Sequence, residues 1–365
     1  MLNRGSISPI GIDMGSQNVY AAQLRTVRQG FAVRGLFHRR IEKTEDGADG
    51  TAEMLSVFKE IRKDKRFSGR RVVMHLPPQS VFRFPIRFHI TGEESLEEAI
   101  LRESRGYLPF PLEEAILDYP SLVPPAPGDG TPYRAMIVAV RREEIRQYVS
   151  LLKQAGLVLE AVDFSLSSLI RLHSCFVPTH ENPVLLCHIG DTKSMIAVVT
   201  ADSMLAQRYV SWGIGTLLQK LLTAFNLGEG ESKAEALLKE YGLLFEDRGN
   251  EQKSPGVALD AEGEEVSRAI YQILSPHVEE LIHELHKTIG YVRSEGWNAP
   301  AEGLYLYGYA TYVRYLEQYL ETRLSIPTQL MNPVSKMLFS DEHILPDKSQ
   351  GAPFGLALGL AMRRI

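Results

Sequence analysis

The feature that most constrains the fold is a strand that runs directly into a glycine turn near the start of the chain. Residues 7–13 form an apolar run that ends at Asp13, and a second apolar run follows at residues 19–24. Between them lies a turn of small and polar residues: Gly15, Ser16, Gln17 and Asn18. Glycine lets backbone N–H groups approach a phosphate, and serine and asparagine add side-chain donors. The pattern predicts a phosphate-binding turn, although an ordinary hairpin turn favours the same residues.

The same pattern returns about 175 residues later. An apolar strand at residues 184–189 runs into Gly190, Asp191 and Thr192, and strands at 194–200 and 204–210 continue it. A third glycine turn, at Gly308 and Tyr309, lies between an expected strand and an expected helix. Two such hairpins predict a duplicated α/β architecture whose halves face one nucleotide.

The segment between the two hairpins reads as a small unit of its own. Residues 79–90 alternate in polarity as a half-exposed strand does, and a capped helix follows from about residue 91. A further strand is expected at 133–140 and a helix at 143–155, which Gly156 ends. We therefore expect a compact unit of alternating strands and helices at 80–160. Later in the chain, the polar stretch at about 245–265 predicts a mobile loop.

Composition and charge narrow the classes of function. The 365 residues carry 40 Lys and Arg against 45 Asp and Glu, and a net charge of −5 excludes a protein that coats nucleic acid. Two cysteines exclude a disulfide scaffold and are typical of a reducing compartment. The longest apolar runs fall far short of the roughly 20 residues of a membrane span, and residues 1–9 lack the apolar core of a signal peptide. We therefore expect a cytoplasmic protein.

Charge is distributed unevenly along the chain. Residues 1–71 hold 14 Lys and Arg against 8 Asp and Glu, and the excess peaks at residues 59–71. A solvated helix face with its following loop explains such a run. The alternative is a weak basic patch facing anionic lipid, where each basic side chain contributes about 1 kcal/mol.

The two phosphate hairpins and the later glycine turn, in this order, resemble the actin, Hsp70 and sugar-kinase superfamily. Within it, the chain resembles the PilM-like type IV pilus assembly proteins, relatives of the cell-division protein FtsA. The best-matching stretch is residues 96–119, which includes the proline-locked segment Tyr107 to Pro111. The resemblance covers about residues 8–365. It implies an actin-like, two-lobed α/β fold with an early inserted small α+β subdomain: a first lobe of residues 1–79, 161–183 and 335–365, the insertion at 80–160 and a second lobe at 184–334.

The resemblance also implies a role in binding. PilM-like proteins are cytoplasmic adaptors, peripheral at the bacterial inner membrane, that bind the short N-terminal tail of the bitopic membrane protein PilN. Other proteins of the pilus platform and the assembly ATPase are further candidate partners, and nucleic acid is not expected. The tail would lie in a groove between the first lobe and the insertion, lined by Leu76, Val81, Phe82, Phe84, Leu101, Tyr107 and Leu108. For any one of these residues, ordinary packing in the core is the simpler explanation.

The resemblance also implies a nucleotide site at a defined set of positions. They are Asp13, Gly15, Ser16, Gln17, Asn18, Gly190, Asp191, Thr192, Gly213, Glu235, Lys287, Gly308 and Tyr309, with Asp13 as the metal-binding candidate. Four places depart from the family pattern, and at one of them Lys287 stands where the family often has arginine. His188 stands where a carboxylate is expected, Tyr309 follows Gly308 in place of a second glycine, and a lysine expected after Glu235 falls one position late, at Lys239. We therefore expect weak binding of ATP and Mg²⁺ at most, and no hydrolysis.

Two alternatives stay open at this point. One is an active ATPase or small-molecule kinase of the same superfamily, which needs a carboxylate base near its substrate hydroxyl; Asp163 and Asp202 are available. The other is a GspL-like component of a type II secretion system.

Overall fold

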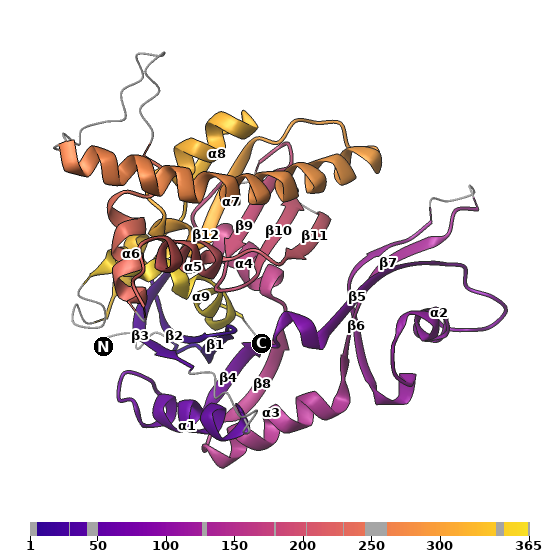
Figure 1. Cartoon of the computed structure of the whole chain (residues 1–365). Helices are drawn as coiled ribbons and strands as arrows, with labels where there is room; N and C mark the ends of the chain where they lie inside the picture. Colours follow the sequence, from indigo (N-terminus) through magenta and orange to yellow (C-terminus); the bar gives the residue numbers. More distant parts are fainter. Residues whose placement is uncertain are drawn as a thin grey trace.

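The computed structural model describes residues 6–28, 30–41, 50–125, 130–178, 180–201, 203–228, 230–244, 261–340 and 347–363. The first lobe is built on a six-stranded sheet with the order β14-β3-β2-β1-β4-β8 (Figure 1). Its strands are β1 (Ile10–Met14), β2 (Asn18–Val27), β3 (Gly30–Arg40), β4 (Arg71–His75), β8 (Val158–Asp163) and β14 (Leu338–Phe339). Strands β1, β4 and β8 run parallel, whereas β2 runs antiparallel to β1.

Alternation along β1 explains how helices cover both faces of this sheet. Ile10, Ile12 and Met14 point into a core shared with α1 (Gly50–Lys63) and α3 (Arg142–Gln154). The opposite face, at Gly11, receives α9 (Gly355–Ala361), which also packs on α4 (Ser165–His173). A Cβ at Gly11 would lie 2.1 Å from the Ala357 carbonyl oxygen, so this approach requires glycine.

The second lobe repeats the strand plan of the first. Its sheet has the order β11-β10-β9-β12-β13, with β9 (Val184–Ile189), β10 (Ser194–Val199), β11 (Met204–Val210), β12 (Gly303–Gly308) and β13 (Thr328–Leu330). As around β1, one neighbour of the central β9 is antiparallel and the other is parallel. The described helices of this lobe are α5 (Ile214–Ala224), α6 (Glu231–Glu240), α7 (Ala261–Ser294) and α8 (Leu316–Leu324). The matching order confirms the duplicated architecture expected from the two hairpins.

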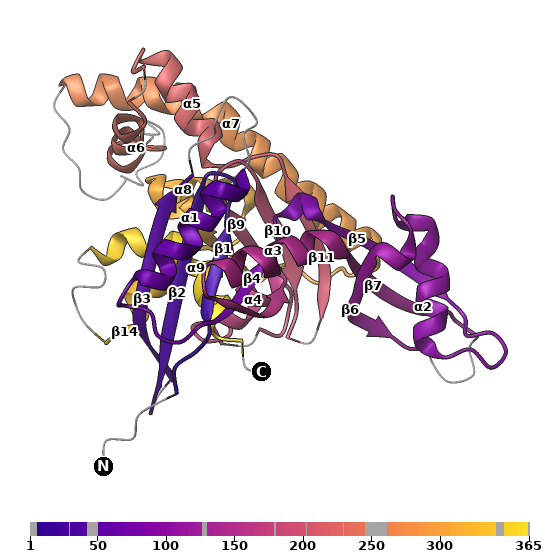
Figure 2. The ribbon, with the colours of Figure 1, turned by 90° about the horizontal axis from the view of Figure 1, so that it is seen from below.

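A small sheet-and-helix unit projects from the first lobe (Figures 1 and 2). It contains β5 (Val81–Phe88), α2 (Leu96–Ser104), β6 (Ala115–Val123) and β7 (Tyr133–Arg141), in the strand order β5-β7-β6 and with a core of its own. Helix α3 packs instead on α1, and β8 pairs with β4 in the first lobe. We therefore propose residues 81–141 as the inserted unit, shorter than the span of 80–160 taken from the sequence.

Two further expectations concern the second lobe and the membrane. Most of the expected mobile loop at 245–265 lies outside the described residues, and its last five residues are helical because α7 begins at Ala261. Pro276 lies inside α7. Among the described helices, none combines the length and the apolarity that crossing a bilayer requires.

Candidate functional site

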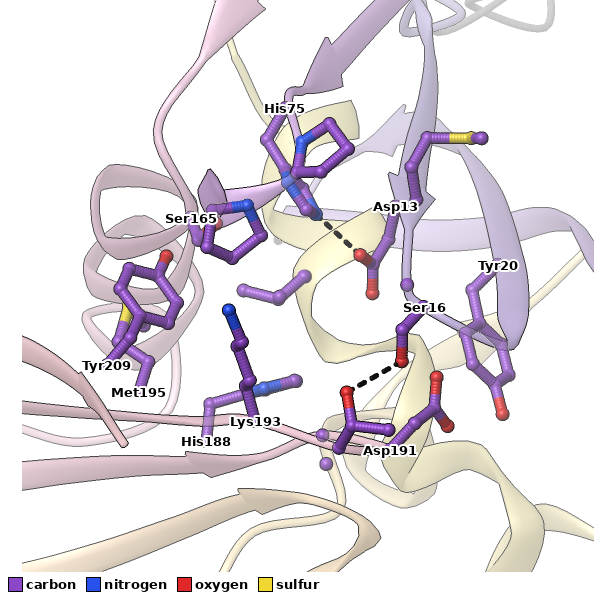
Figure 3. A pocket seen from close by; sticks show the side chains of 18 of the residues that line it. Asp13, Ser16, Tyr20, His75, Ser165, His188, Asp191, Lys193, Met195 and Tyr209 are labelled. Carbon is purple, nitrogen blue, oxygen red and sulfur yellow. Dashed lines mark hydrogen bonds and ion pairs between the residues drawn. The ribbon is translucent and has the colours of Figure 1, made fainter. Parts of the chain in front are cut away.

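A cavity of about 300 Å³ lies between the two lobes, where β1, β9 and β12 end (Figure 3). Because these strands run parallel within each sheet, their carboxyl ends deliver side chains to the same edge. The residues that line it come from both lobes: Asp13, Met14, Gly15, Ser16, Tyr20, His75, Pro77, Pro78, Gln79, Ser165, His188, Gly190, Asp191, Thr192, Lys193, Met195, Tyr209, Gly308, Tyr309, Pro353 and Leu356. The three glycine turns expected from the sequence therefore meet at one cavity.

Asp13, the candidate metal ligand, already has a cationic partner. Its Oδ1 lies 2.5 Å from Nε2 of His75, and Nδ1 of His75 lies 3.0 Å from the carbonyl oxygen of Leu76. Burial alone would lower the pKa of His75, but the charge of Asp13 and these hydrogen bonds raise it above its usual value. Since both ring nitrogens face acceptors, His75 is an imidazolium and forms a buried ion pair with Asp13.

His188 occupies, on β9, the place that Asp13 occupies on β1, two residues before the glycine of the turn. Burial lowers its pKa to about 4, so the imidazole is neutral at neutral pH. Its buried Nε2 has no hydrogen-bond partner among the described residues. A neutral imidazole supplies no charge to a Mg²⁺ shell, which prefers oxygen ligands.

Asp191 joins the second turn to the first. Its Oδ1 accepts a hydrogen bond from Nδ2 of Asn18 at 2.8 Å, and its Oδ2 accepts one from the backbone N–H of Gln17 at 3.2 Å. Beside it, the hydroxyls of Ser16 and Thr192 are 3.0 Å apart. Burial raises the pKa of Asp191, although the donors at Asn18 and Gln17 oppose the shift. The hydrogen-bond donors at Gln17 and Asn18 would suit a phosphate. In this structure they contact the carboxylate of Asp191 instead.

Aromatic side chains close the side of the cavity next to the third turn. Gly308 has a φ of 71°, and a Cβ there would lie 2.2 Å from the carbonyl oxygen of Ile189, so only glycine fits. Tyr309 follows it and is buried; its hydroxyl contacts Asp191 and lies 2.6 Å from the hydroxyl of Tyr20. Burial raises the pKa of both tyrosines, so both stay protonated. Because a carboxylate only accepts, Tyr309 donates to Asp191.

Five of the expected nucleotide-binding residues lie away from the cavity lining. Lys287 pairs with Glu284 at 2.8 Å, and Glu284 also pairs with Arg208 on β11. Glu235, on α6, pairs with Lys239 at 3.5 Å. Gly213 precedes α5 and packs against the backbone of Asp191, where a Cβ would lie 2.4 Å from the carbonyl oxygen. Gln17 and Asn18 do not line the cavity either, because they face Asp191.

The residues do not fit a magnesium nucleotide. Among the described residues, no cluster of three or more His, Cys, Asp or Glu could hold a metal ion. Asp13 is paired with a cation, His188 is neutral, and Asp191 uses the donors of the first turn. Among the described residues that line the cavity, Lys193 is the exposed cation, and its side chain extends into the cavity in Figure 3.

The expected groove residues fall into two groups. Leu76 and Phe84 are 2 % and 7 % exposed and belong to the packed interior. Tyr107 is 51 % exposed and stacks on Phe84 with ring centroids 4.9 Å apart, and Leu101 is also exposed. The remaining three, Val81, Phe82 and Leu108, are half-buried around them.

Sequence reasoning missed His75, Tyr20 and Lys193. For His75 a signal was available, because β1 and β4 are parallel neighbours and the pairing of Ile12 with Met74 places His75 beside Asp13. A buried charged residue at the end of a strand next to a strand that ends in aspartate predicts an ion pair. Tyr20 and Lys193 carry no such signal, because each belongs to an ordinary strand or turn pattern.

Comparison with known proteins agrees with this architecture. The structure is similar to that of a PilM–PilN type IV pilus biogenesis complex, with a TM-score of 0.74 and 22 % sequence identity over 97 % of this chain and 98 % of the other. It is also similar to the ethanolamine utilization protein EutJ of Carboxydothermus hydrogenoformans, with a TM-score of 0.55 and 13 % identity over 98 % of this chain and 89 % of the other. These similarities confirm the actin-like fold.

The sequence itself matches a family profile almost from end to end. The profile describes the type IV pilus assembly protein PilM and aligns with residues 11–251 and 228–365 of this chain. The match covers the hairpins of both lobes and the inserted unit. The chain therefore belongs to the PilM family of type IV pilus assembly proteins.

Proposed function

We propose that the protein is a cytoplasmic adaptor of a type IV pilus assembly platform, peripheral at the inner membrane, that binds the N-terminal cytoplasmic tail of a PilN-like membrane protein. The observation that carries the proposal is the surface of the inserted unit. Nine large apolar side chains are exposed among the described residues, and four of them lie in the unit: Ile90, Leu101, Tyr107 and Val123. Exposed apolar side chains gathered in so short a segment favour a binding surface.

The strands of the unit suit an extended peptide. In the order β5-β7-β6, both β5 and β6 pair only with β7 and leave one edge each without a strand partner among the described residues. An extended segment can add to such an edge through main-chain hydrogen bonds while its side chains enter apolar pockets. Tyr107 and Leu101 are the accessible apolar contacts, and the half-buried Val81, Phe82 and Leu108 complete the set.

One contact ties this unit to the second lobe. The guanidinium of Arg83, on β5, lies 5.0 Å from the ring centroid of Tyr209, which also lines the central cavity. Burial lowers the pKa of Arg83, and the contact of its guanidinium with the ring of Tyr209 partly offsets the cost of burying the charge. The unit is therefore held in a defined position, and a preformed groove binds a peptide at a smaller entropic cost than a mobile one.

We further propose that the nucleotide site has degenerated and does not hydrolyse ATP. Hydrolysis by this fold needs carboxylates that face a Mg²⁺ ion and a water molecule. Asp13 instead forms an ion pair with His75, and His188 stands in the second place. The same geometry argues against a small-molecule kinase, because neither carboxylate of the cavity is free to act as a base. The geometry does not separate a pilus role from a GspL-like role in secretion, and the family membership favours the pilus.

Peptide binding is tested by titrating the purified chain with a fluorescent peptide that copies the N-terminal tail of a PilN-like protein. Tyr107→Ala should weaken binding at least about tenfold, since a buried aromatic anchor contributes on the order of 1–3 kcal/mol. Tyr291→Ala is the matched control, because Tyr291 is 52 % exposed but lies on α7 in the second lobe. Equal binding by both variants, or no binding by the parent chain, contradicts the proposal.

The absence of hydrolysis needs a separate measurement. Phosphate release from ATP with Mg²⁺ should equal the background without protein, and Asp13→Ala should not change it. Magnesium-dependent release that Asp13→Ala abolishes would overturn the degenerate site and leave the peptide proposal intact.

A further inference from the structure

The end of the first lobe opposite the cavity carries a concentration of positive charge. Strands β1, β4 and β8 are parallel, so their carboxyl ends lie at the cavity and their amino ends lie at the far edge of the sheet. Helices α1 and α3 precede β4 and β8 and run back along the sheet, so both helices end at this far edge (Figure 2). The turn between β2 and β3 lies there too, because β2 is antiparallel to β1.

Nine basic residues belong to this edge, and we call them the basic face. All nine are exposed: Arg25, Arg28, Arg62, Lys63, Lys65, Arg66, Arg70, Arg71 and Lys153. They come from the end of β2, the ends of α1 and α3, and the segment that joins α1 to β4.

Contacts between these segments make the face continuous. A Cβ at Gly156, just after α3, would lie 3.9 Å from Nε of Arg62. The backbone N–H of Val158 donates to the carbonyl oxygen of Arg70 at 2.8 Å. A side-chain nitrogen of Arg71 donates to the carbonyl oxygen of Ile7 at 3.4 Å, and Ile7 bridges to Arg25. The cations therefore share one surface although they are up to 128 positions apart in the sequence.

Few carboxylates neutralise the face. Among the described residues, Asp64 pairs with Arg66 at 2.6 Å and Glu160 pairs with Arg71 at 3.1 Å. No ion pair of the described chain involves the other seven: Arg25, Arg28, Arg62, Lys63, Lys65, Arg70 and Lys153. Helix dipoles favour cations at the ends of α1 and α3, which accounts for Arg62, Lys63 and Lys153. That explanation does not extend to Arg25, Arg28, Lys65 and Arg70.

We propose that the basic face binds the anionic surface of a lipid bilayer directly. The net charge of the whole chain is −5, so cations gathered on one face make it unlike the rest of the protein. Val158 lies beside Arg70 and is 56 % exposed, which gives the face an apolar contact at its centre. A bilayer fits better than a single acidic peptide, because seven unpaired cations on an exposed edge match a continuous sheet of negative charge rather than one groove. This contact goes beyond the tail-binding role and does not depend on it.

The experiment measures binding of the full chain to phosphatidylcholine vesicles with and without phosphatidylglycerol by co-sedimentation. The parent chain should bind only the anionic vesicles, and binding should weaken steeply as salt rises, because exposed charges are screened. A chain that carries Lys63→Glu, Lys65→Glu and Arg70→Glu should bind at least about 100-fold more weakly, given about fivefold per basic side chain near the surface at moderate ionic strength. Within the described ranges these three residues form no ion pair, so their reversal should leave the fold intact.

The control variant changes the net charge by the same amount elsewhere. It carries Lys220→Glu, Lys233→Glu and Arg293→Glu, three exposed residues of the second lobe, and it should bind the vesicles as the parent chain does. Equal loss in the two variants would overturn the proposal, because net charge alone would then explain binding. Tighter binding of the parent chain to a DNA duplex of the same charge density than to the vesicles would also overturn it, as would equal binding to both kinds of vesicle. Peptide binding should be unchanged in the same variants. A loss of vesicle binding can then be told apart from a loss of binding to the PilN-like tail.

Discussion

The two glycine turns occupy equivalent places in two sheets of the same topology, yet their side chains are opposite in character. The first turn follows Asp13, which is paired with a protonated His75, and it offers hydrogen-bond donors at residues 16–18. The second turn follows the neutral His188 and offers the carboxylate of Asp191. The hydrogen-bond donors of the first turn, at Gln17 and Asn18, therefore meet their acceptor, the carboxylate of Asp191, in the second turn. The two turns are thus complementary to each other in this structure, and this supports the proposal of a degenerate nucleotide site, since a nucleotide needs two turns that both face it.

The largest expected effect comes from removing the acceptor. Asp191→Ala leaves the amide of Asn18 and the N–H of Gln17 without their partner in a buried place, and the free energy of unfolding should fall by about 3 kcal/mol. Urea unfolding followed by circular dichroism measures the change. Asp118→Ala is the control, because the hydrogen bond that Asp118 makes within the described residues is to the neighbouring backbone N–H of Tyr119. Similar stabilities of the two variants would show that the turns do not depend on each other.

The next prediction concerns the pH dependence of stability, which should have opposite signs for the histidine next to each turn. Burial holds the pKa of His188 at about 4 in the folded state, below its value of 6.5 in an unfolded chain. Between pH 6.5 and 4 the unfolded state therefore takes up the proton first, and stability falls on acidification by up to about 3 kcal/mol from this residue alone. His188→Leu should flatten the acid limb of a plot of urea midpoint against pH. An unchanged limb would contradict burial as the cause.

His75 should behave in the opposite way. Its pKa is raised in the folded state by Asp13, so its contribution to stability is complete below pH 6.5 and is lost as pH rises through the folded-state value. His75→Gln should therefore destabilise the protein more at pH 6 than at pH 9. A pH-independent loss would mean that the ring acts through packing and not through its charge.

The contrast between the turns was only partly predictable from the sequence. The apolar runs on either side of the glycine turns predicted the strands near residues 10–24 and 184–210. Local periodicity and turn chemistry determine these strands, and both can be read from the sequence. The sequence also predicted His188 as a departure. It did not predict that Asp191 binds the first turn, because that contact joins residues 173 positions apart and depends on how the lobes close. The end that we propose for the inserted unit differs from the sequence-based bound for a similar reason, since α3 has an amphipathic pattern that would suit either neighbour.

A smaller effect is expected from the third turn. Tyr309→Phe removes the hydroxyl that contacts Asp191 and Tyr20 and keeps the ring in its place. One neutral and one charge-assisted hydrogen bond are lost, so we expect a destabilisation of about 1.5 kcal/mol. Tyr291→Phe, at an exposed position, should change nothing. A loss in Tyr309→Phe as large as that of Asp191→Ala would mean that the tyrosine, and not the first turn, is the main partner of the carboxylate.

The smallest effect is expected for the exposed hydroxyl pair between the two turns. It shows whether contacts at the surface contribute to holding the turns together. The hydroxyls of Ser16 and Thr192 are 3.0 Å apart and exposed, so water replaces either partner when the other is removed. Ser16→Ala should therefore change the free energy of unfolding by less than about 0.5 kcal/mol. Thr192→Val, a substitution of similar shape, should have the same small effect, and the double variant should equal the sum. A coupling energy above about 1 kcal/mol between the two would show that the hydroxyl pair also holds the lobes together, beside Asp191 and the pair of Tyr20 with Tyr309.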